Sequence, residues 1–246
     1  FIYLNTRRPP LNNMVFRKAL SLAINRDLLV ARTLGYRGIP ATGLIPPGIA
    51  DSKSGTDFRQ TGGALLDPAD GEKCLEQLYT AGYPNEDGYP EIDILVVDSV
   101  VPLEMTKILA EMWEINLGLK VKIEAVSYDQ FLELASTGRF YTARQGWTGD
   151  YPDPMTFLNL FHSQAAENFC SYKDPEYDYW LSVAQERMDT ISRYRIYHLL
   201  EEKLISDLPI IPLYFNVKPY LVSQRLKGLT YSPQGFPLFR KAGKVD

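Results

Sequence analysis

Two spacings of apolar residues alternate along the chain and divide it into predicted strands and helices. Apolar residues that alternate with polar ones, or that form short runs, predict strands. We expect strands over residues 1–6, 92–98, 121–126, 140–143 and 210–215. Apolar residues three or four positions apart predict helices over residues 12–34, 68–81, 102–117, 129–135, 155–161, 177–188 and 191–208. The remaining segment, 217–246, shows short strand and turn patterns.

The predicted helix limits rest on residues that favour helix ends. The pair Asn12-Asn13 suits an N-cap for the first helix, and Gly35 suits its end. Asp67-Pro68 suits the N-cap and first turn of the next helix. Between these helices, residues 36–66 form a long irregular stretch rich in proline and glycine. Loops of this length in a compact domain are usually functional or packed across a partner surface.

The order of the predicted elements indicates the fold class. Strands separated by helix-length crossovers are typical of an α/β layer architecture. A strand at each end of the alternation favours a mixed sheet flanked by helices. Neither a G-x-G-x-x-G nor a G-x-x-x-x-G-K-[ST] pattern occurs, so dinucleotide-binding and P-loop functions lose their main support.

Composition excludes several classes of protein. A chain of 246 residues is one large domain or two small ones, at roughly 100–200 residues per domain. The net charge of −4 and the lack of a basic run disfavour a nucleic-acid partner. The longest apolar runs, such as 92–97, are strand-sized and too short to span a membrane. The chain begins at Phe1 without an initiator methionine, and we interpret it as a fragment of a longer protein.

The two cysteines leave two alternatives open. Cys74 and Cys170 lie far apart in the sequence and form either one disulfide or two buried thiols. No C-x-x-C pattern occurs, and the histidines are His162 and His198 alone. A zinc or redox site is therefore disfavoured, and we expect no metal or cofactor.

Residues 144–154, RQGWTGDYPDP, carry the most informative chemistry. They follow a predicted strand and precede a predicted helix, which is where α/β proteins place ligand contacts. Arg144 offers a planar fork to carboxylates and carbonyls, Trp147 a flat apolar wall, and Asp150 a counter-charge for a cation. The two glycines let a ligand backbone come close. Together these groups suit a zwitterionic chain such as a peptide. The alternative is a surface ion pair between Arg144 and Asp150, with Trp147 as core filler.

The same stretch resembles a known family. It is similar to the R-x-G-W-x-x-D-Y-x-[DE]-P segment of the extracellular solute-binding proteins, family 5, that serve oligopeptide ABC transporters. Residues 16–26, FRKALSLAINR, resemble that family's V-R-K-A-L-x-x-A-I-[DN]-R helix, a specific match. Further similar segments lie at 1–13, 40–43, 46–48, 81–84 and 213–216.

The resemblance implies a fold and a function. It implies the C-terminal lobe of a type II periplasmic-binding-protein fold, with residues 1–216 as the ligand-binding lobe. Residues 217–246 would be a return segment towards an N-terminal lobe that the chain lacks. The implied protein captures oligopeptides for an ABC importer, without catalysis, and delivers them to permease and ATPase subunits. It would be extracellular or periplasmic, anchored as a lipoprotein in the full-length parent.

The resemblance also assigns roles to residues. It places Asp150 against the α-ammonium of the bound peptide, Trp147 as a pocket wall and Arg144 near the peptide chain. Backbone groups would come from Gly146, Thr148 and Gly149. Weaker candidates for ligand contact are Tyr151, Asp153, Tyr214 and Asn216.

Two positions depart from the family pattern, and the sequence leaves alternative functions open. Pro102 and Ala135 stand where some peptide-binding members carry a histidine and an arginine, so the site for the peptide's C-terminus stays unassigned. One alternative is the ligand-sensing domain of a transcription regulator, and another is binding of dipeptides or another small solute. A hydrolase using Asp150 and Asp153 as paired carboxylates is disfavoured, because the prolines that flank Asp153 suit a turn.

Overall fold

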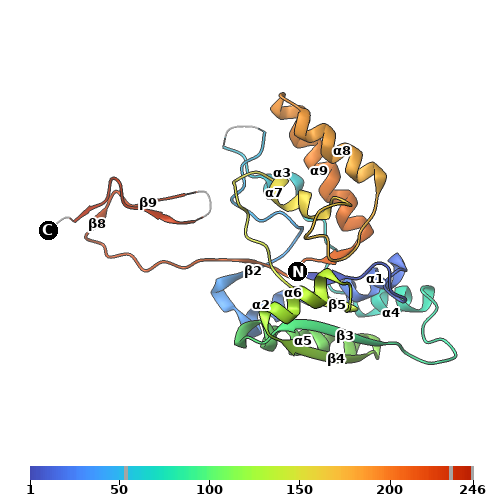
Figure 1. Cartoon of the computed structure of the whole chain (residues 1–246). Coiled ribbons are helices and arrows are strands. Elements are labelled where there is room, and N and C mark those ends of the chain that lie inside the picture. Colours follow the sequence, from blue (N-terminus) through green and yellow to red (C-terminus); the bar gives the residue numbers. More distant parts are fainter. Residues whose placement is uncertain (53–54, 233–234, 245–246) are drawn as a thin grey trace.

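The computed structural model describes residues 1–52, 55–232 and 235–244, which form an α/β body with a projecting C-terminal arm (Figure 1). A five-stranded sheet in the order β4-β3-β5-β1-β6 lies within the body. Its strands are β1 (Ile2–Leu4), β3 (Glu91–Val97), β4 (Lys120–Val126), β5 (Thr142–Arg144) and β6 (Ile210–Ile211). Strand β3 pairs in parallel with β4 and β5, whereas β1 pairs antiparallel with β5 and β6. The predicted α/β class with a mixed sheet is confirmed.

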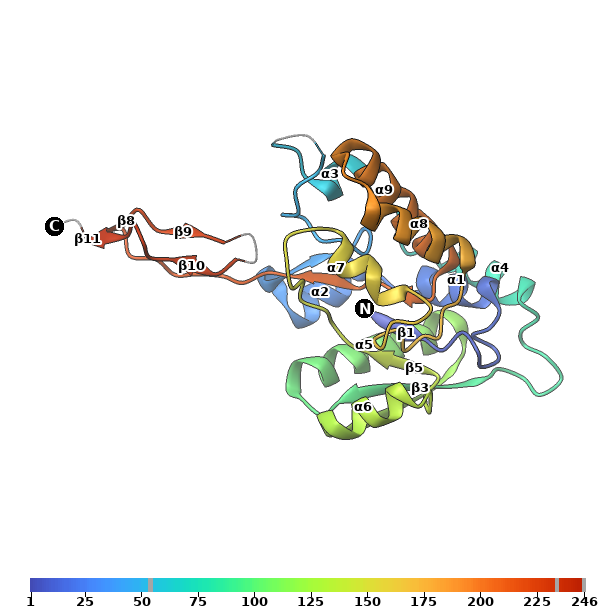
Figure 2. The ribbon, with the colours of Figure 1, turned by 45° about the horizontal axis from the view of Figure 1, so that its top comes forward.

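Helices cover both faces of this sheet, because successive strand residues point to opposite sides. In β1, Ile2 and Leu4 join one buried cluster and Tyr3 joins the other. The first cluster includes residues of α1 (Met14–Leu22), α2 (Arg26–Thr33), α4 (Gly71–Thr80) and α5 (Val100–Leu117). The second includes residues of α6 (Tyr128–Ser136), α7 (Met155–Leu158), α8 (Pro175–Glu186) and α9 (Thr190–Asp207). Figure 2 shows α5 and α6 on either side of β3.

The helix predicted over residues 12–34 is wrong in its extent, since two helices occupy that segment. Helix α1 starts after Asn13, whose side chain accepts from the Val15 N–H at 2.9 Å. It ends before Ala23, and Asn25 then caps α2 by accepting from the Leu28 N–H at 2.9 Å. A second capping side chain inside the segment therefore restarts the helix in a new direction.

The start of the next helix also differs from its prediction. Asp70, not Asp67, is the N-cap of α4, and its Oδ1 accepts from the Lys73 N–H at 3.0 Å. Helix α5 begins two residues before the expected Pro102 and ends, as expected, at Gly118 in the left-handed conformation with φ 67°. Capping residues thus mark helix ends in this chain, but two nearby aspartates cannot be ranked from sequence alone.

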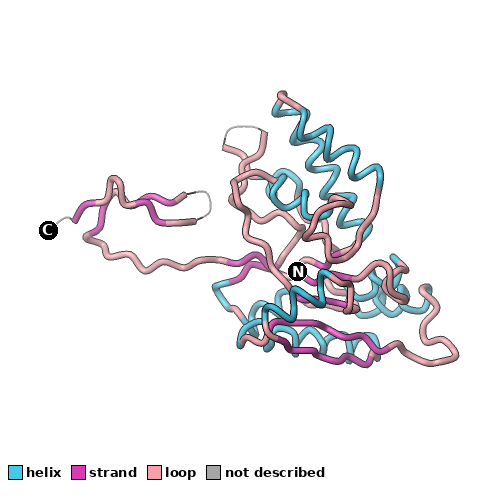
Figure 3. The backbone as a smooth tube through the Cα atoms, viewed as in Figure 1, coloured by secondary structure: helices cyan, strands magenta, loops and turns pink. Residues whose placement is uncertain are grey.

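The predicted strand over 210–215 is divided in two. Strand β6 ends at Ile211, and β7 (Tyr214–Asn216) leaves the main sheet to pair with β2 (Gly38–Pro40). The β2–β7 ladder lies where the body meets the arm (Figure 3). The arm carries the pairs β8 (Leu226–Lys227) with β11 (Gly243–Lys244), and β9 (Thr230–Tyr231) with β10 (Pro237–Leu238). The division into domains at residue 216 stays a prediction.

Short helical segments complete the body. They are η1 (Gly35–Arg37), α3 (Phe58–Gly62) and η2 (Asn159–Phe161). The stretch 36–66, expected to be irregular, therefore contains β2 and α3 as well as a long loop.

Both cysteines are buried free thiols, which resolves the alternative left by the sequence. Cys74 belongs to the cluster around α5 and Cys170 to the cluster around α9, on opposite sides of the sheet. Burial raises the pKa of the Cys170 thiol to about 12. Trp113 is a core residue at helical spacing, and its indole N–H donates to the Leu20 carbonyl at 3.0 Å.

Candidate functional site

Three segments meet at one edge of the sheet and form the candidate site. The carboxyl end of β5 lies beside the start of β1, with Ile2 opposite Arg144 and the Gln145 N–H donating to the Phe1 carbonyl at 3.1 Å. Ile2 also lies opposite Ile211, so the chain that leaves β6 begins at the same edge. The loop 145–154 and residues 212–217 are therefore held together by the sheet register.

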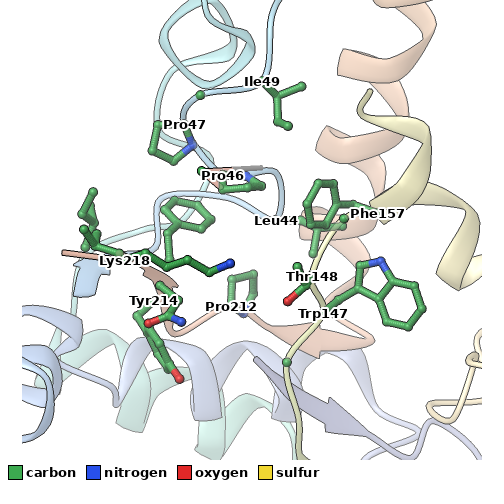
Figure 4. Close-up of a pocket in the computed structure, with 18 of the residues that line it drawn as sticks. Leu44, Pro46, Pro47, Ile49, Trp147, Thr148, Phe157, Pro212, Tyr214 and Lys218 are labelled. Atoms are coloured by element: carbon green, nitrogen blue, oxygen red, sulfur yellow. The ribbon is translucent and has the colours of Figure 1, made fainter. Parts of the chain in front are cut away.

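A cavity of about 760 Å³ lies at this edge (Figure 4). This volume falls within the roughly 300–1,000 Å³ typical of small-molecule and cofactor sites. Its walls are largely apolar and come mainly from residues 144–157, the loop 44–49 and the segment 212–220. In Figure 4, Leu44, Phe157, Thr148 and Trp147 lie along one side, Tyr214 and Lys218 along the other, and Pro46 and Pro212 between them.

Most of the residues predicted from the sequence line this cavity. The lining includes Arg144, Gly146, Trp147, Thr148 and Gly149, together with Tyr151, Tyr214 and Asn216. Asp150 and Asp153 belong to the same loop but not to the lining. The fold therefore gathers eight of the ten candidates around one cavity, while their contacts with a ligand stay a prediction.

Arg144 links two of the converging segments. Its Nη2 donates to the Tyr214 hydroxyl at 2.5 Å, which ties the end of β5 to β7. Its Nε is buried and has no hydrogen-bond partner within the described residues. No ion pair joins Arg144 to Asp150 in the part of the chain that the structure describes, so the surface pair considered as an alternative is not formed.

The two aspartates of the loop have different environments. The Asp150 side chain is exposed, and its backbone N–H donates to the Thr156 hydroxyl at 3.1 Å. Asp153 is turned into the protein, where its Oδ1 accepts from the Met155 N–H at 2.9 Å and its Oδ2 lies 3.7 Å from Arg193 Nη2. Asp153 therefore shapes the loop, whereas the exposed Asp150 carboxylate makes no hydrogen bond or ion pair with another described residue.

The two glycines of the loop serve different purposes. A Cβ on Gly149 would lie 3.0 Å from Thr156 Cγ2 and 3.2 Å from Phe157 Cζ, so glycine permits close packing against α7. A Cβ on Gly146 would meet no atom within 4 Å. Close packing against α7 thus favours glycine at position 149, while the open space beside Gly146 leaves its backbone accessible.

Trp147 belongs to both the cavity and the core. The side chain is partly buried against the cluster around α9, and its Nε1 is buried without a hydrogen-bond partner among the described residues. A buried indole N–H usually finds a partner, so this donor is a candidate for a ligand or water oxygen. Beside it, burial together with the Asp153 and Asp150 carboxylates raises the pKa of Tyr151, which keeps that phenol protonated.

The loop 44–49 was not among the predicted site residues, although the sequence predicted a long irregular stretch over 36–66, either functional or packed across a partner surface. A buried ion pair beneath it fixes its path. Glu201 Oε1 accepts from the Leu44 and Ile45 N–H groups at 2.8 and 2.9 Å and from Arg59 Nη1 at 2.5 Å. Glu201 is fully buried on α9. Farther along, His198 Nε2 lies 3.0 Å from Asp51 Oδ2. Helix α9 therefore holds one wall of the cavity in place.

The family of the chain follows from comparison with known proteins. The model of the bacterial extracellular solute-binding proteins, family 5 (middle region), matches residues 1–169. The chain belongs to this family. That assignment confirms the resemblance carried by the motifs at 16–26 and 144–154.

Individual family 5 proteins are similar over nearly the whole chain. A periplasmic oligopeptide-binding protein of Escherichia coli is 30% identical over 236 residues, which is 92% of this chain and 41% of that protein. A dipeptide-binding protein of Bacillus subtilis is 28% identical over 96% of this chain and 43% of that protein. The chain therefore spans about two fifths of the length of these curated relatives.

Solved structures of the family share the fold. The substrate-binding domain of an oligopeptide ABC transporter from Bacillus anthracis has a TM-score of 0.84 and 27% identity, covering all of this chain and 49% of that one. A peptide-binding protein of a peptide ABC transporter has a TM-score of 0.80 and 28% identity, covering 87% of this chain and 96% of that one. The predicted periplasmic-binding-protein fold is confirmed.

The described residues were also compared with the requirements of a membrane-spanning helix and of a metal site. No helix within residues 1–52, 55–232 and 235–244 is long and apolar enough to cross a membrane. The same residues contain no group of three or more His, Cys, Asp and Glu side chains placed to hold a metal ion. Family 5 consists of extracellular and periplasmic solute-binding proteins, which bind their solutes without converting them.

Proposed function

We propose that this chain is the ligand-binding lobe of a substrate-binding component that captures oligopeptides for an ABC importer. The observation that carries the proposal is the cavity, since the family motif at 144–154 and the return strand β7 both contribute to its lining. A peptide would be clamped between this lobe and a second lobe, with residues 217–246 running towards that second lobe. The site would bind and release its ligand without catalysis.

Backbone recognition would give this site broad specificity. Gly146, Thr148 and Gly149 line the cavity and present main-chain groups that can pair with any peptide backbone. The apolar walls from Leu44 and Phe157 would accept side chains of varied shape. Such an arrangement suits a protein that takes up many peptides rather than one.

Asp150 would bind the α-ammonium of the peptide. Its exposed carboxylate has no hydrogen bond or ion pair within the described part of the chain, so it can pair with a cation. An ammonium taken from water into a closed cleft requires such a partner, because its desolvation is otherwise not offset. Pro102 and Ala135 supply no charge, so neither would hold the other end of the peptide.

The partners and location of the whole protein follow the same proposal. The binding component would deliver peptides to a permease and an ATPase, outside the cell or in the periplasm, and a lipoprotein anchor would hold it to the membrane. The sequence of the gene upstream of Phe1 tests this point. A signal segment followed by a lipobox cysteine supports it, whereas a helix-turn-helix segment would contradict it and favour a regulator, for which the relatives give no support.

Calorimetry on the full-length gene product tests the ligand class. Di-, tri-, tetra- and pentaalanine are titrated, with maltotriose as a solute of similar size. We expect saturable binding of the tri- to pentapeptides and none of maltotriose. Binding of dialanine alone would favour the dipeptide alternative, and lack of binding of every peptide at millimolar concentration would refute the proposal.

A further inference from the structure

The charges that line the cavity are of one sign. Arg144 and Lys218 are cationic, and none of the described lining residues is an aspartate or a glutamate. The Arg144 guanidinium already donates to the Tyr214 hydroxyl. Lys218 has no hydrogen bond or ion pair to any other described residue, so its ammonium is the cavity's unpaired charge.

The backbone places Lys218 firmly at the cavity wall. The β2–β7 ladder pairs Asn216 with Gly38, and the Val217 N–H extends the ladder by donating to the Arg37 carbonyl at 2.9 Å. Lys218 follows directly, and Pro219 restricts the chain after it. The backbone of the residue immediately before Lys218 is therefore held against β2 at the border of the cavity.

The contacts of the Lys218 side chain leave its donors available. Its Nζ lies 4.3 Å from the centroid of the Phe236 ring, a cation–π distance. An aromatic face attracts the ammonium without accepting its three N–H donors in strong hydrogen bonds. In Figure 4 Lys218 lies across the cavity from Thr148 and Trp147, and its side chain extends towards the middle of the cavity.

We propose that Lys218 binds a carboxylate of the ligand and thereby selects for ligands that carry one. This inference rests on the proposed function and adds a second charge contact to it. Thr148, on the loop 145–154 that also carries Asp150, lies across the cavity from Lys218, which follows β7. An ammonium held at Asp150 and a carboxylate held at Lys218 would fix the direction in which a peptide lies. The attraction is electrostatic, so it weakens as ionic strength rises.

A peptide can supply the carboxylate from its C-terminus or from an acidic side chain. Two matched pairs of probes separate these sources. The first pair is Ala-Phe-Ala and its C-terminal amide. The second is Ala-Glu-Ala amide and Ala-Gln-Ala amide, which differ only in the side-chain charge.

The test is calorimetry of the full-length gene product with all four probes, as wild type, Lys218→Met and Lys227→Met. Methionine keeps most of the length of lysine and removes its charge. Lys227 is an exposed lysine on the same arm that does not line the cavity, so its variant controls for a change in net charge. We expect Lys218→Met to weaken binding of the charged member of at least one pair about tenfold, or about 1.4 kcal/mol. Its neutral counterpart should stay within about twofold, and Lys227→Met should bind all probes as the wild type does.

The probes that lose affinity in Lys218→Met show which carboxylate of the peptide Lys218 binds. A loss confined to Ala-Phe-Ala assigns Lys218 to the C-terminal carboxylate, and a loss confined to Ala-Glu-Ala amide assigns it to an acidic side chain. Three outcomes would overturn the inference: equal effects on both members of each pair, no effect on any of the four probes, or the same loss in Lys227→Met. In each of these cases, peptide binding by the wild type would still support the proposed function. If the wild type binds none of the four probes, the proposed function itself fails.

Discussion

Replacing Glu201 with alanine should destabilise the protein and release the loop that forms one wall of the cavity. Glu201 Oε1 accepts three hydrogen bonds, from the Leu44 and Ile45 N–H groups and from Arg59 Nη1. Both members of the ion pair are nearly inaccessible, at 7% exposure for Arg59 and 0% for Glu201. The variant therefore leaves a guanidinium and two amides buried without their acceptor.

The size of the effect follows from these contacts. Hydrogen bonds to a charged group contribute about 1.5–3 kcal/mol each, but three that share one oxygen are not additive. Removing one partner of a buried pair costs about 3–5 kcal/mol, and we expect a loss in that range. With an m-value of about 3 kcal/mol per molar urea, the unfolding midpoint should fall by about 1–1.7 M.

Urea denaturation followed by far-UV circular dichroism measures this loss. Glu202→Ala is the matched control, because Glu202 is the exposed neighbour on the same helix and its loss should change stability by no more than about 0.5 kcal/mol. The double variant Arg59→Ala/Glu201→Ala should cost less than the sum of the two single variants. A loss under about 1 kcal/mol in Glu201→Ala, or strict additivity in the cycle, would refute the argument that this pair holds the loop.

Three further outcomes are expected. Gly149→Ala should lower the free energy of unfolding by about 1–3 kcal/mol, because the added methyl group would crowd Thr156 and Phe157. Gly146→Ala, where there is open space, should lower it by less than about 0.5 kcal/mol. Thermal unfolding measures both losses, and equal losses in the two variants would contradict the difference in packing. Cys74 and Cys170 should resist iodoacetamide in the native state at pH 8, because both thiols are buried and burial raises the pKa of each. Both should react in urea. Labelling of either cysteine in the native protein, detected by peptide mapping, would contradict this expectation. Residues 1–246 alone should bind Ala-Phe-Ala at least tenfold more weakly than the full-length gene product, and equal affinity would show that a second lobe adds nothing.

Local sequence signals predicted much of this fold and part of its site. Helix α5 and the strands β3 and β4 matched their predictions within two residues, because their apolar patterns are long and regular. The motif at 144–154 likewise identified one wall of the cavity. These features depend on residues close together in the chain.

Features that depend on distant contacts were missed or misplaced. Leu44 and its neighbours line the cavity because Glu201, 157 residues away, accepts their N–H groups, and no local pattern reports such a contact. Lys218 has no motif around it and acquires its place only through the pairing of β7 with β2. The division of the predicted strand at Pro212 reflects the same cause, since the chain changes partners there from β1 to β2.

Calorimetry of the full-length gene product with Ala-Phe-Ala and with its N-acetylated form tests the proposed role of Asp150 directly. Acetylation removes the ammonium and leaves the rest of the peptide unchanged. We expect the wild type to bind the acetylated peptide at least tenfold more weakly. We also expect Asp150→Asn to bind the free peptide as weakly as the wild type binds the acetylated one. Equal affinities of the wild type for the two peptides would contradict the role proposed for Asp150.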